Sequence, residues 1–350
     1  MSGKLSGRIL AALAVLLLSV SAEAQIASPL GPSEVGIPLT HRVKFTSAIN
    51  GKTYVLRIQV PSFAPPPPRG YPVVYVLDGD QFFGAATDIN FSMSQHAVVV
   101  GIGYDLINEP AEVAKIIGRK PDDTSPIGAA DIGRAGGIER FDDLTPPIAP
   151  ENRKPAWQEP EKSGNLDTFL KVLETEIKPK AAAVAPIDAS NATLFGHSAG
   201  GLAVLHALFT EPQAFRTFVA ASPAIWWNAR AVLADEKAFS KLVEAHGASP
   251  RILITVGSLE EPKNPRTITP EIRAFLDSLP PDRRAEVMAY KKKSDAWGGM
   301  VTNARNLGER LCALHGGKDY KAQFVLFEGE HHESSAFAAL SRGMHFALEN

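Results

Sequence analysis

A serine between glycines is the first candidate for chemistry in this sequence. Gly196-His197-Ser198-Ala199-Gly200 lies between a predicted strand that ends at Phe195 and a predicted helix that begins near Gly201. A strand-to-helix turn strains the backbone at the serine, and small neighbours allow both the turn and the close approach of a substrate. A serine hydroxyl is a weak nucleophile at neutral pH, so it needs a base that a carboxylate orients. The motif therefore predicts Ser198 as a nucleophile with two partners elsewhere in the chain.

Two histidines follow the last predicted strand, which covers Phe324 to Phe327. The chain continues as Glu328-Gly329-Glu330-His331-His332-Glu333-Ser334. This order places His331 and His332 at the carboxyl edge of the sheet, where a base for Ser198 is expected. The alternative interpretation is an exposed polar loop. We prefer His332 as the base, with His331 as the second choice.

The candidate acid follows another predicted strand, Ile252 to Val256. That strand runs into Gly257-Ser258-Leu259-Glu260-Glu261, between the nucleophile and the base in chain order. We choose Glu260 over Glu261, although either could be a solvated loop charge. The spacing alone leaves both alternatives open.

An ester carbonyl that is attacked by a serine develops negative charge, which two backbone N–H groups can stabilise. The residue after the nucleophile, Ala199, supplies one of them. The other is expected from the turn Leu77-Asp78-Gly79-Asp80, from Gly79 or Asp80. The competing interpretation of Asp78-Gly79 is a plain turn.

Buried parallel strands are the elements that could bring these residues together. Val73 to Leu77 and Ala97 to Ile102 are continuous apolar runs, typical of strands covered on both faces by helices. Before them, Asn50-Gly51 between two β-rich segments predicts an antiparallel hairpin. Strands and helices alternate through the rest of the chain, which predicts a mostly parallel, doubly wound α/β sheet.

Two segments of the chain are expected to interrupt this alternation of strands and helices. Periodicity fades from Tyr104 to Glu161, which indicates a long inserted loop or lid region. A helix is expected over Leu166 to Ile177, with Pro179 closing it. The residues after Glu261 are a second candidate insertion, and both insertions are expected to cover the pocket.

The N-terminus differs from the rest of the chain. Lys4 and Arg8 precede an apolar run from Ile9 to Val20, and Ala22-Glu23-Ala24 follows. This pattern predicts a secretory signal peptide over residues 1–24, cleaved after Ala24, and a single domain over residues 25–350. The apolar run is short for a bilayer span of about 20 residues. We expect a periplasmic or secreted protein without integral membrane association.

Composition excludes some classes of partner. The formal net charge of −2 gives the chain no overall electrostatic attraction to nucleic acid, and the single cysteine allows no internal disulfide. No His-Glu-x-x-His pattern occurs, so no metal site and no cofactor are expected. The expected partner is a small-molecule ester.

A set of motifs follows in order along the chain. They are Tyr75-Val76-Leu77-Asp78-Gly79-Asp80, Arg140-Phe141-Asp142-Asp143-Leu144-Thr145-Pro146, Ser163-Gly164, Ile177-Lys178-Pro179, Gly196-His197-Ser198-Ala199-Gly200-Gly201, Ser222-Pro223-Ala224-Ile225-Trp226-Trp227 and Gly257-Ser258-Leu259-Glu260. Together they resemble the putative-esterase (esterase D-like) family of α/β-hydrolases, and within it the branch of siderophore trilactone esterases. The resemblance implies an α/β-hydrolase fold, Ser198 as nucleophile, His332 as base and an oxyanion amide around Gly79 to Asp80. The family pattern Gly-Glu-Asp-His-Gly-Ser reads Gly329-Glu330-His331-His332-Glu333-Ser334 here, which selects His332.

Three further residues are candidates for substrate binding. Trp226 or Trp227 could stack on an aromatic acyl group, or both could pack in the core or lid. Arg140 could meet an anionic substrate, or form an internal ion pair with Asp142 or Asp143. The expected activity is a serine carboxylic-ester hydrolase acting through an acyl-Ser198 intermediate, on siderophore-type lactones. The alternatives are an acyltransferase on the same scaffold and a non-catalytic periplasmic binding protein.

Overall fold

The computed structural model describes residues 36–61, 65–155, 162–261 and 270–348. The chain divides into two units, Met1–Gly36 and Ile37–Asn350, and the fold below is that of the second unit. The expected signal peptide over residues 1–24 lies outside the described residues. Among the described helices, none is long and apolar enough to cross a bilayer.

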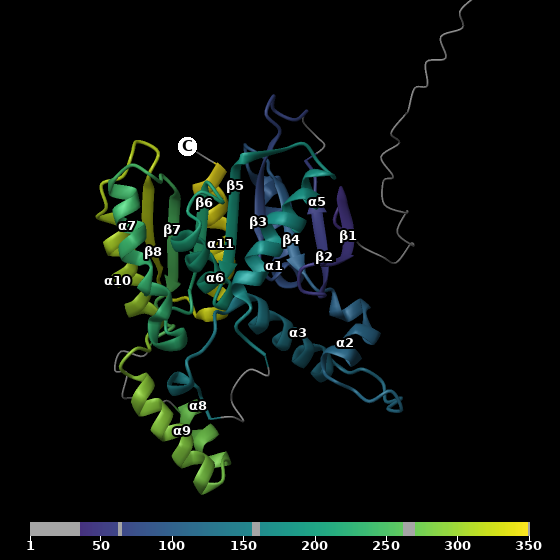
Figure 1. The fold of residues 1–350 in the computed structure, drawn as a ribbon, viewed down its shortest axis with the longest axis vertical. Helices are drawn as coiled ribbons and strands as arrows, with labels where there is room; N and C mark the ends of the chain where they lie inside the picture. Colours follow the sequence, from purple (N-terminus) through teal and green to yellow (C-terminus); the bar gives the residue numbers. More distant parts are fainter. Residues whose placement is uncertain (1–35, 62–64, 156–161, 262–269, 349–350) are drawn as a thin grey trace, which may run out of the picture. The chain divides into compact units, whose positions relative to one another are not determined.

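One eight-stranded sheet forms the centre of the second unit, in the order β1-β2-β4-β3-β5-β6-β7-β8 (Figure 1). The neighbours from β4 to β8 pair in parallel, while the β1–β2 hairpin is antiparallel and joins the sheet antiparallel to β4. This arrangement confirms the predicted α/β-hydrolase architecture with an N-terminal hairpin. The strands are β1 Thr40–Thr46, β2 Thr53–Gln59, β3 Tyr71–Val76, β4 Val98–Gly103, β5 Ile187–His197, β6 Thr217–Ala221, β7 Arg251–Gly257 and β8 Lys321–Phe327.

Helices cover both faces of this sheet, because alternate side chains of its buried strands point to opposite sides. On one face, α1 (Gly79–Ser92) and α11 (His332–Leu348) pack on Val74, Val99 and Val219. On the other face, the core is built around α6 and α4. The helices of that face are α4 Leu166–Val172, the π turn Leu173–Ile177, α5 Lys178–Ala182, α6 Ala199–Thr210, α7 Glu236–Glu244 and α10 Met300–Cys312.

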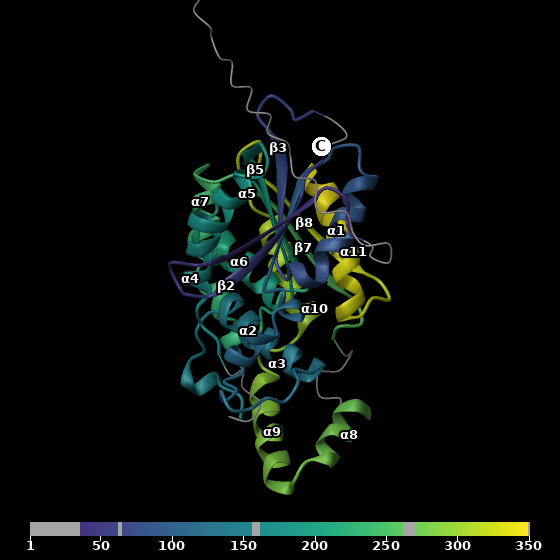
Figure 2. The same ribbon diagram turned by 90° about the vertical axis from the view of Figure 1, so that its right-hand side faces the viewer.

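The segment expected to be irregular, from Tyr104 to Glu161, contains helices. They are the 3-10 turn Leu106–Asn108, α2 Pro110–Ile116, α3 Ala129–Leu144 and the 3-10 turn Pro150–Asn152. Helix α3 buries acidic side chains, Glu139, Asp142 and Asp143, among its inward-facing residues. The hydrophobic periodicity that normally reveals a helix is therefore absent. The second insertion holds α8 (Pro270–Ser278) and α9 (Pro281–Ser294), and α9 extends beyond the strand ends in both views (Figure 1, Figure 2).

The prediction that Pro179 ends a helix is wrong. The chain passes from α4 through the π turn into α5, and Pro179 lies in the first turn of α5. A proline inside a helix lacks an N–H and clashes with the preceding turn. The wider π turn just before it accommodates both effects, so the helical path continues.

Strained residues mark the carboxyl ends of four strands. Asp78, Asp105, Ser198 and Ser222 follow β3, β4, β5 and β6, and each has a positive φ between 42° and 60°. Non-glycine residues rarely adopt this conformation, and such strain clusters at functional sites. The carboxyl edge of the sheet is therefore where a site is expected.

Candidate active site

Ser198 occupies a tight turn between β5 and α6. Its φ of 60° and ψ of −114° lie outside the common regions, and its N–H is held by the carbonyl of Ala221, at 3.0 Å. Gly200 lies beside the loop after β3, since a Cβ there would make an ordinary contact, at 3.4 Å, with a carboxylate oxygen of Asp78. The turn thus places the half-buried Ser198 at the sheet edge, close to the loop after β3.

His332 and Glu260 meet at this edge. His332 Nδ1 lies 2.5 Å from Glu260 Oε2, and the Glu260 side chain is almost fully buried, whereas that of His332 is about one-third exposed. A carboxylate partner keeps the proton on Nδ1 and leaves Nε2 as the basic nitrogen. This is the arrangement that the base of a nucleophilic serine requires.

The second carboxylate oxygen of Glu260 is held by three donors. Ser222 Oγ and the N–H of Gly257 each lie 2.6 Å from Oε1, and Ser335 Oγ lies 2.9 Å from it. Burial raises the pKa of Glu260, but the hydrogen bonds from His332, Ser222 and Gly257 outweigh it and hold the pKa below its usual value. Glu260 is therefore an oriented, ionised carboxylate. Sequence reasoning missed Ser222 and Ser335, although Ser222 stands directly after a strand in one of the family motifs.

The two alternatives lie elsewhere. Glu261 accepts hydrogen bonds from the N–H and the hydroxyl of Thr302, both at 2.7 Å. His331 is exposed, and its N–H donates to Ser334 Oγ. Within the described part of the chain, the structure brings only His332 and Glu260 together among the candidates for base and acid.

His197 ties the nucleophile's strand to the segment of the base. Its Nε2–H donates to the carbonyl oxygen of His332 at 2.9 Å, and the centroids of the two rings are 4.4 Å apart. Burial, followed by the charge on His332, lowers the pKa of His197 to about 4. At neutral pH the His197 side chain is therefore uncharged.

The second oxyanion candidate is the first turn of α1. Asp78 is the N-cap residue, but its side chain makes no cap hydrogen bond and instead pairs with Arg140 Nε and Nη2 at 2.8 and 2.9 Å. The first-turn N–H groups of a helix have no partner within it, so those of Gly79 and Asp80 can serve a bound anion. Gly79 must be a glycine, because a Cβ there would lie 2.5 Å from the backbone of Gly101.

Arg140 has a different partner from those expected. It binds Asp78 rather than Asp142 or Asp143, and its Nη2 also donates to the carbonyl of His197 at 3.1 Å. The expected ion pair within α3 is thus replaced by a bridge between the loop after β3 and the strand before Ser198. Asp142 and Asp143 instead bind Lys52.

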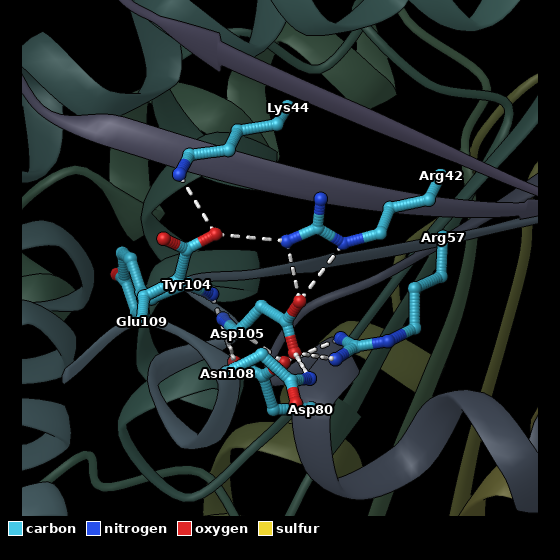
Figure 3. Close-up of polar contacts among 8 residues, drawn as sticks. All are labelled: Arg42, Lys44, Arg57, Asp80, Tyr104, Asp105, Asn108 and Glu109. Atoms are coloured by element: carbon cyan, nitrogen blue, oxygen red, sulfur yellow. Dashed lines mark hydrogen bonds and ion pairs between the residues drawn. The ribbon is translucent and has the colours of Figure 1, made fainter.

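The side chain of Asp80 fixes its own loop to the edge hairpin (Figure 3). Its carboxylate accepts the N–H groups of Tyr104 and Asp105 and pairs with Arg57 of β2. Arg42 reaches the same network from β1 through Asp105. These contacts hold the first turn of α1, and with it the amide of Asp80, against β2 and the end of β4.

The two tryptophans have different surroundings. Trp227 is buried, stacks on Phe141 and donates its Nε1–H to Pro146, so it packs in the core. Trp226 lines a cavity of about 320 Å³ that also contains Glu260. A larger cavity of about 600 Å³ lies between the β1–β2 turn, α2 and α3, and is not lined by Ser198, Glu260 or His332. Among the described residues, no group of three or more potential ligands could hold a metal ion.

Comparison with known proteins shows the family to which the chain belongs. A family model described as "Putative esterase" matches residues 130–296. The ferri-bacillibactin esterase BesA of Bacillus subtilis (strain 168) is 32% identical over 89% of this chain and 90% of its own length. The chain belongs to the putative esterase family.

Two further proteins resemble the chain over similar lengths. The siderophore triacetylfusarinine C esterase of Aspergillus fumigatus is 29% identical, covering 92% of this chain and 98% of its own. The crystal structure of the BES protein from Bacillus cereus has a TM-score of 0.66, at 28% identity, and covers 92% of this chain. The family assignment and the fold therefore agree, and the chain is a hydrolase of the esterase class.

Proposed function

We propose that this esterase is an exported serine hydrolase that opens siderophore-type lactone esters through an acyl-Ser198 intermediate. The observation that carries the proposal is the 2.5 Å contact between His332 Nδ1 and Glu260 Oε2, at the same sheet edge as the strained Ser198. The names of the similar proteins, a ferri-bacillibactin esterase and a siderophore triacetylfusarinine C esterase, support the siderophore class. The sequence pattern of residues 1–24 supports export.

In the first half of the reaction, His332 Nε2 accepts the proton of Ser198 as Oγ attacks the ester carbonyl carbon. The oxyanion that forms is stabilised by the N–H of Ala199 and by that of Gly79 or Asp80. His332 then gives the proton to the departing alcohol oxygen, which leaves an acyl-serine ester. Glu260 stabilises the imidazolium throughout and is not itself protonated.

In the second half, water replaces the alcohol. His332 Nε2 takes a proton from the water molecule as its oxygen attacks the acyl carbon, and the same amides stabilise the second oxyanion. Return of the proton to Ser198 Oγ releases the acid and regenerates the enzyme. For a trilactone, which holds three ester bonds, the product of the first turnover is a linear ester that remains a substrate.

Hydrolysis of trilactone siderophores by the purified protein tests the proposal. We expect linear products from the trilactone, and a stable covalent adduct on Ser198 with a fluorophosphonate probe. Ser198→Ala should abolish both, while the circular dichroism spectrum stays unchanged. Hydrolysis at the wild-type rate by Ser198→Ala, or wild-type protein without any ester turnover, would falsify the proposal.

A further inference from the structure

Three consecutive residues after Trp227 adopt the left-handed conformation. Asn228, Ala229 and Arg230 have φ values of 48°, 53° and 67°, with ψ values of 49°, 40° and 30°. Residues with a Cβ visit this conformation singly and seldom in a run, because the Cβ approaches the following carbonyl oxygen. Such strain persists only where surrounding contacts fix it, and it is concentrated at functional sites. The contacts of this left-handed turn therefore indicate its role.

The side chain of Asn228 holds the loop that follows α3. Its Oδ1 accepts the N–H of Ala149 at 3.0 Å and an Nδ2–H of Asn152 at 2.9 Å. Its own Nδ2–H donates to the carbonyl oxygen of Pro147 at 3.1 Å. One side-chain amide thus makes three hydrogen bonds to residues 147–152.

Asparagine suits this position for two separate reasons. It is among the few residues with a Cβ that readily adopt the left-handed conformation, because its short polar side chain hydrogen-bonds locally. Its amide also both donates and accepts, as the contacts with Pro147, Ala149 and Asn152 require. Aspartate would lack the donor. Glycine would keep the backbone conformation and lose all the contacts of the side chain.

The loop that Asn228 holds lies between two cavities. Ile148 and Arg153 line the cavity of about 600 Å³. Lys154 lines the cavity of about 320 Å³, and its Nζ lies 5.3 Å from the ring centroid of Trp226, which lines the same cavity. The loop therefore forms a partition, with the larger cavity on one side and the smaller cavity on the other.

The same left-handed turn also reaches the opposite wall of the smaller cavity. Arg230 Nη2 donates to the carbonyl oxygen of Ala296 at 3.2 Å, and Trp297, the next residue, lines the cavity. The turn thus contacts the first insertion through Asn228 and the second insertion through Arg230. The contact of Arg230 is exposed, whereas that of Asn228 with Ala149 is partly buried. Water competes less for a buried hydrogen bond, so Asn228 is the stronger anchor.

From these contacts we infer that Asn228 is a positioning residue that holds the partition between the two cavities and thereby limits the size of the ester that the smaller cavity accepts. The inference rests on the proposed function, because it takes the smaller cavity as part of the substrate site. Glu260 lines that cavity and contacts His332. A volume of about 320 Å³ is at the lower end of ligand pockets, so a partition that yields should admit longer chains.

Three esters of different length test the inference. Ethyl acetate is short on both sides, ethyl hexanoate is long on the acyl side, and hexyl acetate is long on the alcohol side. Asn228→Gly should raise the kcat/KM of one longer ester relative to ethyl acetate, mainly through KM. Each further methylene that the widened cavity buries is worth about fourfold, so the ratio should rise about fourfold or more.

Ala229→Gly is the matched control for the kinetic test. It lies in the same left-handed turn, and glycine keeps that conformation while removing only a methyl group. The ratios of kcat/KM in Ala229→Gly should equal those of the wild type. Wild-type ratios for both longer esters in Asn228→Gly, or the same rise in Ala229→Gly, overturn the inference.

Hydrogen exchange separates this inference from the proposed function, because it needs no turnover. The N–H of Ala149 has Asn228 Oδ1 as its acceptor, so a peptide covering residues 147–155 should exchange faster in Asn228→Gly than in the wild type or Ala229→Gly. Faster exchange in Asn228→Gly alone supports the positioning role even if the wild type hydrolyses none of the esters. Equal exchange in all three proteins refutes that role and leaves the hydrolase proposal intact.

Discussion

His197 Nε2 donates to the carbonyl oxygen of His332 across a distance of 2.9 Å. His197 is the residue before the proposed nucleophile, and His332 is the proposed base, so one hydrogen bond links the two segments. Arg140 continues the link by binding both the carbonyl of His197 and the carboxylate of Asp78. The loop of the oxyanion amides, the nucleophile turn and the base are thereby joined through side chains that take no part in the chemistry themselves.

Stability should fall on mild acidification because of His197. The pKa of His197 is about 4 in the folded protein, below the ordinary value of 6.5. Between these two pH values, His197 is therefore mostly protonated in the unfolded chain and mostly neutral in the folded protein. The free energy of unfolding that His197 contributes is therefore lost as pH falls from about 6.5 towards 4. The loss between pH 7.5 and pH 5 is about 2 kcal/mol. Urea unfolding of the wild type and of His197→Gln at both pH values measures this loss. The variant should lose less stability than the wild type, and equal losses would refute the assignment.

Glu260 and Glu261 form a matched pair for the acid. Glu260→Gln removes the charge that stabilises the imidazolium of His332 and alters the proton on Nδ1, so kcat should fall by about 10²–10⁴. Glu261→Gln changes only the contact with Thr302 and should keep most of the activity. Turnover of a p-nitrophenyl ester by both variants shows which of the two glutamates is the acid. Near wild-type turnover by Glu260→Gln would eliminate Glu260 as the acid.

The hydrogen bond from the Ser222 hydroxyl should lower the pKa of Glu260. Hydrogen bonds to charged groups contribute about 1.5–3 kcal/mol, so removing the Ser222 hydroxyl should raise the pKa of Glu260 by about one unit or more. The acid limb of the pH profile of kcat/KM is then expected to move upward. Ser222→Gly is the suitable variant, because glycine tolerates the φ of 42°. Ser334→Ala is the control, because Ser334 is exposed and its hydroxyl is hydrogen-bonded to the backbone of His331. The same profile in all three proteins would contradict the role of Ser222.

Substitution of Arg140 should lower kcat more than it changes KM. Lysine cannot reproduce its two-pronged contact with Asp78 together with the bond to His197. Loosening the first turn of α1 should weaken one oxyanion donor, and full loss of such a donor costs about 10²–10³ in kcat. We expect Arg140→Lys to lower kcat about 10- to 100-fold with little change in KM. Arg119→Lys, which alters an ion pair with Asp131 on the same insertion, serves as the control, and equal kcat values in the two variants would argue against the role of Arg140.

The network of Figure 3 should be sensitive to salt. Arg57 and Arg42 are partly exposed, and they balance Asp80 and Asp105. Exposed ion pairs are screened as ionic strength rises. Arg57→Gln should therefore lower the free energy of unfolding by about 1 kcal/mol at low salt, and less at high salt. Chemical denaturation at two salt concentrations checks this, and a difference that does not shrink with salt would point to packing instead.

The sequence by itself determined the architecture and the strand ends where chemistry is placed. Short apolar runs without alternation, bounded by turn residues, predict strands buried on both faces. The strand-to-helix turn at Gly196-His197-Ser198-Ala199-Gly200 requires small residues around the serine. These are local properties, which periodicity and residue size express directly.

Only the tertiary structure decided which side chains meet. Glu260 and Glu261 are neighbours in sequence, as are His331 and His332. Glu260 and His332 contact each other where the segments after the adjacent strands β7 and β8 meet, whereas Glu261 binds Thr302 and His331 is exposed. The pairing of Arg140 with Asp78, and the buried acids that hid α3, also depend on long-range contacts. A residue's direction follows from the packing of distant elements, and that information is absent from any short window of the sequence.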